Sequence, residues 1–278
     1  MASISNIAII RETLALCQQN EALAEAIRTS VSDQSVHLQG EELPLPAPRF
    51  TEDAQVIVSK KRTLEAARAY VGRPTAVLNF ANPIHPGGGV MAGSRAQEEA
   101  LCRCSTLYPC LTDPALQTAF YQPHRGLGNS LGNDDCIYTP GVIVLREDTA
   151  QPALLPPEER YPVDVITCAA PRVHEIRQQL HYVAGSVYAP LSAEELYALH
   201  LQRARRILHL AAHKGAEVII LGAFGCGAFG NDPAVVSRAM MDVVRENRRL
   251  FRTVEFAIYC AASETENYNV FAAAAAAL

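Results

Sequence analysis

The sequence lacks the features of a disulfide-rich, zinc-binding or membrane-embedded protein. None of its eight cysteines forms a C-x-x-C pair, and no His/Cys spacing fits a zinc site. The N-terminus has no basic-then-apolar secretory signal, and no apolar run reaches the ~20 residues that span a bilayer. We therefore expect reduced, mostly buried thiols, no metal and no membrane partner. The expected location is the cytoplasm, with the nucleus as an alternative for a eukaryotic source.

An excess of positive charge is also missing. Lysine and arginine total 24 against 29 acidic residues, which gives a formal net charge of −5. Binding along duplex nucleic acid needs a basic surface, so we expect no sequence-specific nucleic-acid binding. A phosphate-bearing ligand is still compatible with this charge, because a few backbone amides can hold an anion. The length allows a sizeable core, and we predict one domain over 1–278 with an N-terminal helical extension over 1–50.

Hydrophobic patterning predicts an α/β fold. Buried-strand runs are expected at 54–59, 75–80, 142–145, 163–168, 217–221 and 254–260. Helix-forming segments separate these runs. Strands that alternate with helices favour a mixed, largely parallel sheet with helices on both faces.

Several helix boundaries are marked in the sequence. Ser192 and Glu195 form a capping box before a long helix, and the pair Asp232–Pro233 predicts the start of another. The segment after Ala96 is expected to be helical up to Pro109. The polar stretch 111–136 is predicted to be a loop. The tail FAAAAAAL (271–278) indicates a frayed or disordered end, or a cloning remnant.

Two glycine-rich segments follow two of the predicted strands, NFANPIHPGGG (79–89) and GAFGCGAFGND (222–232). Ligands of α/β sheets bind beyond the carboxyl ends of the strands. Glycine permits positive φ, and successive amides form anion-binding nests, so two such loops would suit a diphosphate. Neither loop matches a Walker or Rossmann fingerprint. A purely structural role for the glycine turns is the alternative.

Two phenylalanines lie within the second glycine segment. Phe229, and less strongly Phe224, could stack on a base or ribose. The alternative for each ring is a hydrophobic anchor that holds the segment to the core.

Two adjacent glutamates, Glu98 and Glu99, begin the helix after the first glycine segment. At a helix N-terminus both carboxylates can face a ligand that lies across the helix end, where partial positive charge favours their ionised form. A glutamate that donates a proton instead needs an apolar wall or a nearby diphosphate, which raises its pKa. A simple capping role is the alternative.

The sequence contains the pattern GGG (87–89), followed by seven residues and then QEE (97–99). This pattern resembles the signature of poly(ADP-ribose) glycohydrolases, which are macrodomain-type proteins. The surrounding NFANPIHPGGGVMAGSRAQEEALCRCSTLYPCL resembles the shorter microbial branch, and GAFGCGAFGND resembles that family's diphosphate-contacting loop. The resemblance implies a three-layer macrodomain-like fold. It also implies hydrolysis of the ribose–ribose O-glycosidic bond of poly(ADP-ribose), or of ADP-ribosylated macromolecules, with release of ADP-ribose and without cofactor or metal.

The resemblance also assigns roles by position. Glu99 matches the catalytic acid, which would then serve as the base, and Glu98 matches the residue that holds the ribose hydroxyls. Asn82 matches a ribose-contacting asparagine, and Phe229 matches the aromatic residue near the adenosine. The other expected substrate-binding residues are Gly87, Gly88, Gly89, Gln97, Gly225, Cys226, Gly227 and Ala228.

The sequence departs from the family pattern at two points. Asn79 stands where animal members carry an aspartate, and their catalytic-loop tyrosine has no clear counterpart, with Tyr138 as a candidate. Two other functions would use the same binding site. One is a hydrolase of ADP-ribose on DNA or of related linkages, and the other is a non-catalytic ADP-ribose reader, which has no use for the QEE acid. An unrelated α/β domain with structural glycine turns is the last alternative.

Overall fold

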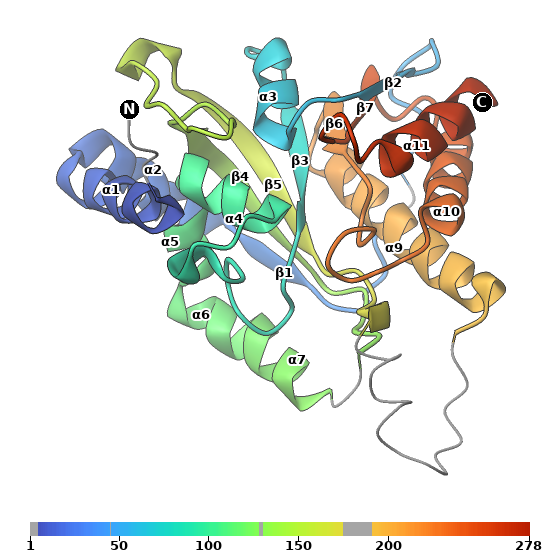
Figure 1. The fold of residues 1–278 in the computed structure, drawn as a ribbon, viewed down its shortest axis with the longest axis horizontal. Helices are drawn as coiled ribbons and strands as arrows, with labels where there is room; N and C mark the ends of the chain where they lie inside the picture. Colours follow the sequence, from blue (N-terminus) through green and yellow to red (C-terminus); the bar gives the residue numbers. More distant parts are fainter. Residues whose placement is uncertain (1–4, 45, 128–129, 175–190) are drawn as a thin grey trace.

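The computed structural model describes residues 5–44, 46–127, 130–174 and 191–278, and a seven-stranded sheet forms its centre (Figure 1). The strand order is β1–β4–β5–β3–β6–β7–β2. The strands are β1 (Ser35–His37), β2 (Gln55–Ser59), β3 (Thr75–Phe80), β4 (Cys136–Val144), β5 (Tyr161–Cys168), β6 (Val218–Leu221) and β7 (Thr253–Ala257). The pairs from β5 to β2 are parallel, whereas β1 and β4 pair antiparallel. The predicted mixed, largely parallel sheet is confirmed.

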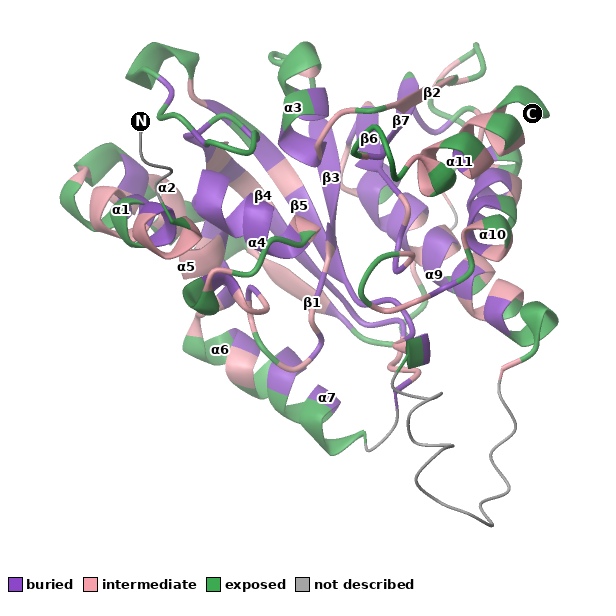
Figure 2. Ribbon diagram, in the orientation of Figure 1, coloured by how far each residue is buried: buried purple, intermediate pink, exposed green. Residues whose placement is uncertain are grey.

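Helices cover both faces of this sheet (Figure 1). On one face lie α9 (Ala193–His213), α10 (Pro233–Glu246) and α11 (Glu266–Ala276), and on the other lie α1 (Asn6–Gln19), α2 (Glu21–Asp33), α4 (Gln97–Cys104) and α5 (Leu107–Leu111). The alternation of side chains along β3 shows why two cores form. Ala76 and Leu78 belong to the core under α9 and α10, whereas Val77 belongs to the core under α4. Figure 2 shows the strands buried between exposed outer helix surfaces.

The N-terminal 50 residues contain a strand as well as helices. Asn20 caps both helices at their junction, because its N–H closes α1 and its Oδ1 accepts from the N–H of Leu23 in α2. After α2, β1 pairs with β4 and joins the sheet. Helix α1 packs on α4, and Thr13 donates a hydrogen bond to the carbonyl of Arg103 over 2.8 Å. The expected helical extension is therefore helical only up to Asp33.

The segment predicted as a loop over 111–136 is helical in part, so that prediction is wrong. Asp113 caps α6 (Pro114–Leu116) by accepting from the N–H of Ala115 over 2.9 Å. A π-helical segment (Gln117–Tyr121) and α7 (Gln122–Gly126) follow. Apolar burial stabilises this helical stretch, since Leu116, Phe120 and Tyr121 all lie in the core beneath α4.

The helix expected from Ala96 to Pro109 is interrupted. Ser105 adopts an extended backbone and pairs with Val144 next to β4, so α4 ends at Cys104. A new helix, α5, then begins at Leu107. Pro109 lies in the first turn of α5, where a missing N–H costs no intrahelical hydrogen bond. Proline therefore does not end the helix here.

The C-terminal tail is the end of a packed helix. Phe271 is fully buried, and its ring centroid lies 5.6 Å from that of Phe256 in β7. Helix α11 packs against α10 and β2. The alanine-rich turns are helical up to Ala276.

The remaining helical elements are short, namely α3 (Thr63–Ala67) and the 3-10 turns Arg68–Tyr70, Val90–Ala92 and Pro157–Glu159. All eight cysteines are free thiols, six of them buried. In the part of the chain that the structure describes, no helix is both long enough and apolar enough to cross a bilayer.

Candidate active site

Both glycine loops lie at one edge of the sheet, because each follows one of two neighbouring strands. Strand β3 ends at Phe80 and leads into the first loop (81–96), and β6 ends at Leu221 and leads into the second loop (222–232). The two strands pair in parallel, so their carboxyl ends lie side by side. This is the edge at which α/β sheets bind ligands.

The first loop closes tightly over the start of α4, and its glycines make that approach possible. Gly87 and Gly88 have φ of +69° and +56°, in the left-handed region that other residues avoid. A Cβ on Gly88 would lie 2.5 Å from Oε1 of Glu99, and one on Gly87 would lie 2.6 Å from the Tyr108 ring. The loop is therefore in contact with the side chain of Glu99.

Glu99 lies beneath the first loop with its two carboxylate oxygens in different surroundings. Oε1 accepts a hydrogen bond from the N–H of Gly89 over 2.9 Å. Oε2 is buried, and no described residue donates to it. The side chain is therefore held at one oxygen only among the described residues.

Glu98 is held at both oxygens. Oε2 accepts from the N–H of Asn82 over 2.7 Å, and Oε1 accepts from the side-chain amide of Asn79 over 3.3 Å. Burial raises the pKa of Glu98 to about 8. The neighbouring Glu99 also raises this pKa, whereas the hydrogen bonds from Asn82 and Asn79 lower it. Burial beneath the first loop therefore favours the neutral form of Glu98.

Gln97 fixes the start of α4 to strand β3. Its Nε2 donates to the carbonyl of Leu78 over 2.7 Å and to the hydroxyl of Thr63 over 3.0 Å, and its Oε1 accepts from the N–H of Phe80 over 2.9 Å. The predicted substrate contact of Gln97 stays a prediction, and Gln97 lines the cavity described below. The hydrogen bonds of its amide within the protein indicate a positioning role as well.

The second loop is held by a buried neutral pair, Asn231 and His200. The Asn231 amide donates to the carbonyls of Gly225 and Pro171 over 2.9 and 2.8 Å, and its Oδ1 lies 2.9 Å from Nε2 of His200. Burial lowers the pKa of His200 to about 4, so the imidazole is neutral and donates to Asn231. Gly225 has φ +79°, and a Cβ there would lie 2.5 Å from Cβ of Ala170.

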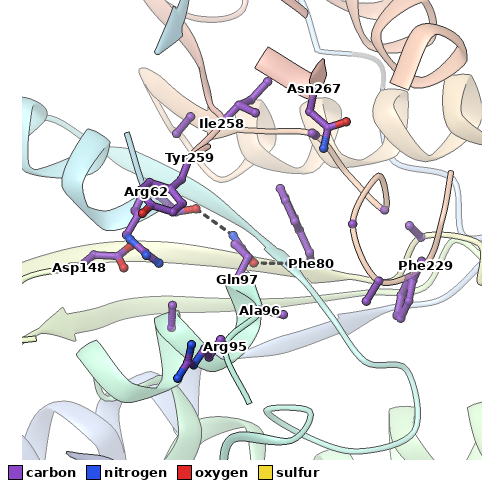
Figure 3. Close-up of a pocket in the computed structure, with 18 residues that line it drawn as sticks. Arg62, Phe80, Arg95, Ala96, Gln97, Asp148, Phe229, Ile258, Tyr259 and Asn267 are labelled. Atoms are coloured by element: carbon purple, nitrogen blue, oxygen red, sulfur yellow. Dashed lines mark hydrogen bonds between the residues drawn. The ribbon is translucent and has the colours of Figure 1, made fainter. Parts of the chain in front are cut away.

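The two phenylalanines of the second loop have different environments. Phe224 is fully buried, with its ring centroid 5.6 Å from Phe80 and 5.8 Å from His200. It is therefore a hydrophobic anchor. Phe229 is half-buried and lines a cavity between the two loops (Figure 3).

This cavity has a volume of about 290 Å³ and extends from the second loop past Gln97 towards α3. Its lining also contains residues outside the sequence motifs, among them Arg62, Asp148, Tyr259 and Asn267 (Figure 3). The guanidinium carbon of Arg62 lies 3.9 Å from the centroid of the Tyr259 ring. Glu98 and Glu99 do not line the cavity, because they lie beneath the first loop at its side.

Tyr138, considered as a catalytic-loop tyrosine, is not part of this site. It is buried on β4 in the core under α9, and its hydroxyl donates to Asp164 over 2.7 Å. Its aromatic face is covered by Lys214, whose Nζ lies 4.8 Å from the ring centroid.

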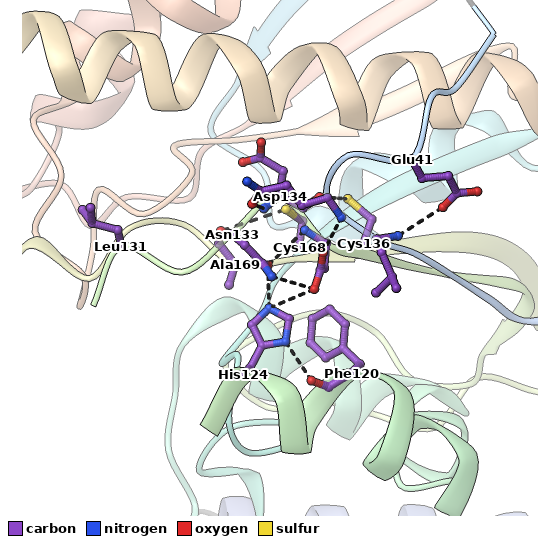
Figure 4. Close-up of polar contacts among 12 residues, drawn as sticks. Glu41, Phe120, His124, Leu131, Asn133, Asp134, Cys136, Cys168 and Ala169 are labelled. Carbon is purple, nitrogen blue, oxygen red and sulfur yellow. Dashed lines mark hydrogen bonds and ion pairs between the residues drawn. The ribbon is translucent and has the colours of Figure 1, made fainter. Parts of the chain in front are cut away.

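A buried polar cluster connects α7, β4 and α9 next to the site (Figure 4). Arg203 donates to Asp134 over 3.0 Å and to the carbonyl of Ala169 over 2.8 Å, and the His124 ring lies between the Phe120 carbonyl and the side chain of Asn133. Buried polar groups that are fully paired in this way fix neighbouring elements in one arrangement. The described residues contain no group of three or more His, Cys, Asp or Glu side chains that could hold a metal ion.

Comparison with known proteins places this geometry in a family. Residues 5–147 match the family described as microbial-type PARG, catalytic domain, in which PARG denotes poly(ADP-ribose) glycohydrolase. No curated protein sequence gives a significant match.

Solved structures from two bacteria are similar over nearly the whole chain. Poly(ADP-ribose) glycohydrolase from Thermomonospora curvata has a TM-score of 0.83 and 32% identity, over 97% of this chain and 98% of that one. The same enzyme bound to the inhibitor ADP-HPD has a TM-score of 0.80 and 32% identity, over 96% and 98%. The Deinococcus radiodurans enzyme in complex with ADP-ribose has a TM-score of 0.76 and 30% identity, over 90% and 97%. The chain belongs to the microbial-type poly(ADP-ribose) glycohydrolase family.

Proposed function

We propose that the protein hydrolyses the ribose–ribose O-glycosidic bonds of poly(ADP-ribose) and releases ADP-ribose, with Glu99 as general acid and then general base. Membership of the family supports the reaction class, and the Deinococcus relative was crystallised with ADP-ribose. The observation that carries the assignment is the asymmetric environment of Glu99. One carboxylate oxygen is fixed by Gly89, and the other has no donor among the described residues.

The reaction needs one proton donor at the leaving oxygen and support for an oxocarbenium-like centre. Glu99 gives its proton to the leaving ribose oxygen as the bond from that oxygen to the anomeric carbon breaks. The ionised Glu99 then takes a proton from the water that attacks the same carbon, so the enzyme returns to its starting state. Glu98 holds the ribose hydroxyls in this scheme, and its position is fixed by Asn82 and Asn79.

The two loops suit the other parts of the substrate. The backbone of Gly87, Gly88 and Gly89 in the first loop and of residues 225–228 in the second provides close approach for a diphosphate. Asn82 contacts the ribose next to the first loop. The cavity beside Gln97 takes the adenosine, with Phe229 as the stacking residue.

The substrate is tested by incubating the purified protein separately with poly(ADP-ribose), mono-ADP-ribosylated protein and ADP-ribosylated DNA. Release of ADP-ribose is measured by chromatography, and Glu99→Gln protein purified in the same way reports contaminating activity. We expect free ADP-ribose from the polymer. Release from DNA or protein alone would favour the related-linkage hydrolase, and binding of ADP-ribose without release from any of the three would favour a reader.

A further inference from the structure

Arg103 is a buried arginine near the end of α4, four residues after Glu99. The residue is only 5% exposed. Its Nη1 donates a hydrogen bond to the carbonyl of Ser94 in the first loop over 2.5 Å. Its Nε is buried and has no acceptor among the described residues, and none of these residues forms an ion pair with it.

Fold stability does not explain why a cation lies at this position. Burial of a charge without an ion-pair partner is unfavourable, and an apolar side chain of similar length would fill the space without that cost. Burial accordingly lowers the pKa of Arg103, whereas the neighbouring Cys104 and Glu99 raise it. The guanidinium is better explained by the part of the chain that it holds.

A continuous series of hydrogen bonds connects Arg103 to Glu99 through the first loop. Arg103 donates to the carbonyl of Ser94, and the N–H of Ser94 donates to the carbonyl of Gly89 over 3.2 Å. The N–H of Gly89 in turn donates to Oε1 of Glu99 over 2.9 Å. Residues four apart lie on the same face of a helix, so both ends of this series are on one face of α4.

The side chain of Ser94 strengthens this connection. A Cβ on Gly89 would collide with the hydroxyl of Ser94, so the two residues are packed directly against each other. A shift of Ser94 away from α4 would therefore also displace the N–H of Gly89.

We propose that Arg103 is a positioning residue for the hydrolysis, which holds Ser94 and Gly89 against α4 so that the N–H of Gly89 stays on Oε1 of Glu99. The inference rests on the proposed function, in which Glu99 transfers the proton. A general acid must lie within hydrogen-bond reach of the leaving oxygen, and the bond from Gly89 fixes the direction of the carboxyl group. Arg103 acts on the reaction only through this loop.

The test replaces Arg103 with methionine, which has a similar length but neither donates a hydrogen bond nor carries charge. We expect kcat on poly(ADP-ribose) to fall at least about tenfold, because small displacements of catalytic groups are costly. The dissociation constant for ADP-ribose, measured by calorimetry, should stay within about threefold of wild type. The Tm should not decrease, since the substitution removes an unpaired buried charge.

Arg125 is the matched control, because it also donates to a carbonyl of the first loop. Its Nη2 donates to the carbonyl of Ile84 over 2.9 Å, but from an exposed position on α7. Ile84 is not part of the series that leads to Glu99. We expect Arg125→Met to keep kcat within about threefold of wild type.

Wild-type kcat in Arg103→Met would overturn the inference. Equal losses of kcat in Arg103→Met and Arg125→Met would also overturn it, because any attachment of the loop would then have the same effect. A loss of kcat with an equal loss of ADP-ribose affinity would do so too, since the loop would then act in binding.

Arg103→Lys keeps the inference testable if the methionine variant does not fold. Lysine retains the buried charge but lacks the planar guanidinium that reaches Ser94. We expect a lower kcat with unchanged ADP-ribose affinity, and wild-type kcat would contradict the role of the guanidinium. All these outcomes compare variants with active wild type, so they are distinct from failure of the proposed function, in which wild-type protein releases no ADP-ribose from polymer.

Discussion

The two glycine loops lie at the same edge of the sheet, but the side chains that contact them differ: those at the first loop are ionisable, and those at the second are neutral. The first loop contacts ionisable groups, since Gly89 donates to Glu99 and the backbone N–H of Asn82 donates to Glu98. The second is held by neutral groups, the amide of Asn231 and the uncharged ring of His200.

Under the proposed function, this difference separates the loop that binds the diphosphate from the loop that contacts the reacting group. In the proposed function, the second loop brings its N–H groups to a diphosphate while the two side chains that hold it, Asn231 and His200, are uncharged. Its acidic residue, Asp232, caps α10 by accepting from the N–H of Ala234. The first loop would instead bring the substrate and the two carboxyl groups together. Its higher electrostatic cost is lowered by the neutral form of Glu98, which burial favours.

Among substitutions within the two loops, the largest effect is expected when the first loop is forced away from Glu99. Gly88→Ala places a methyl group 2.5 Å from Oε1 of Glu99 at φ +56°. We expect ADP-ribose release to fall at least about 100-fold, because small displacements of catalytic groups are costly. Initial rates on poly(ADP-ribose) provide the measurement.

The matched change in the second loop is Gly227→Ala. A Cβ there meets nothing within 4 Å, so the free energy of unfolding should stay within about 0.5 kcal/mol of wild type. A first-loop variant with wild-type rates would show that contact with Glu99 does not matter for activity.

Phe224→Ala tests whether the buried ring of Phe224 anchors the second loop to the hydrophobic core. Loss of this fully buried ring should lower the free energy of unfolding by about 3–5 kcal/mol, measured by denaturant titration. A loss below about 1 kcal/mol would mean that Asn231 holds the loop without help from the aromatic core.

Glu98 should make stability depend on pH. Its pKa of about 8 in the folded chain exceeds its ordinary value of 4.5, so between these values the unfolded chain binds fewer protons. Stability attributable to Glu98 is therefore greatest below pH 4.5 and decreases as pH rises towards 8. The loss is on the order of a few kcal/mol at most.

Glu98→Gln isolates this contribution. Its carbonyl can still accept from Asn82, and the Asn79 amide can turn to offer Oδ1, which accepts from no described residue. We expect denaturation midpoints of the variant to fall less than those of wild type between pH 5 and pH 8. Parallel curves would show that Glu98 is already ionised at pH 5.

A smaller effect than that of Gly88→Ala is expected for Phe229→Ala. Removal of a half-buried stacking ring should weaken ADP-ribose binding about tenfold by calorimetry, with a smaller loss of stability than Phe224→Ala causes. Unchanged affinity would make both phenylalanines anchors, and the contrast between them would disappear.

Much of the scaffold could be predicted from local sequence. The apolar run of β3, the capping box of α9 and the Asp–Pro start of α10 all form as expected. The same Asp–Pro signal occurs at Asp113, but the polar residues that follow it are typical of a loop. The extended residue Ser105 could not be predicted, since it depends on pairing with Val144 far along the chain.

The residues of the site also fall into those that local sequence identifies and those that come together only on folding. The glycines and Glu99 lie in continuous motifs, so the sequence identifies them. Asp148 and Tyr259 come from separate segments and meet only in the folded chain. Gln97 is part of a motif, yet its partners on β3 and α3 are visible only in three dimensions.

The most direct test of the central claim compares turnover with binding in Glu99→Gln. Glutamine keeps an oxygen for the N–H of Gly89 but cannot donate and retrieve the proton. We predict that release of ADP-ribose from poly(ADP-ribose) falls by about 10³-fold or more, whereas the dissociation constant for ADP-ribose stays within about threefold of wild type. Polymer degradation at the wild-type rate would contradict the assignment of Glu99 as the acid.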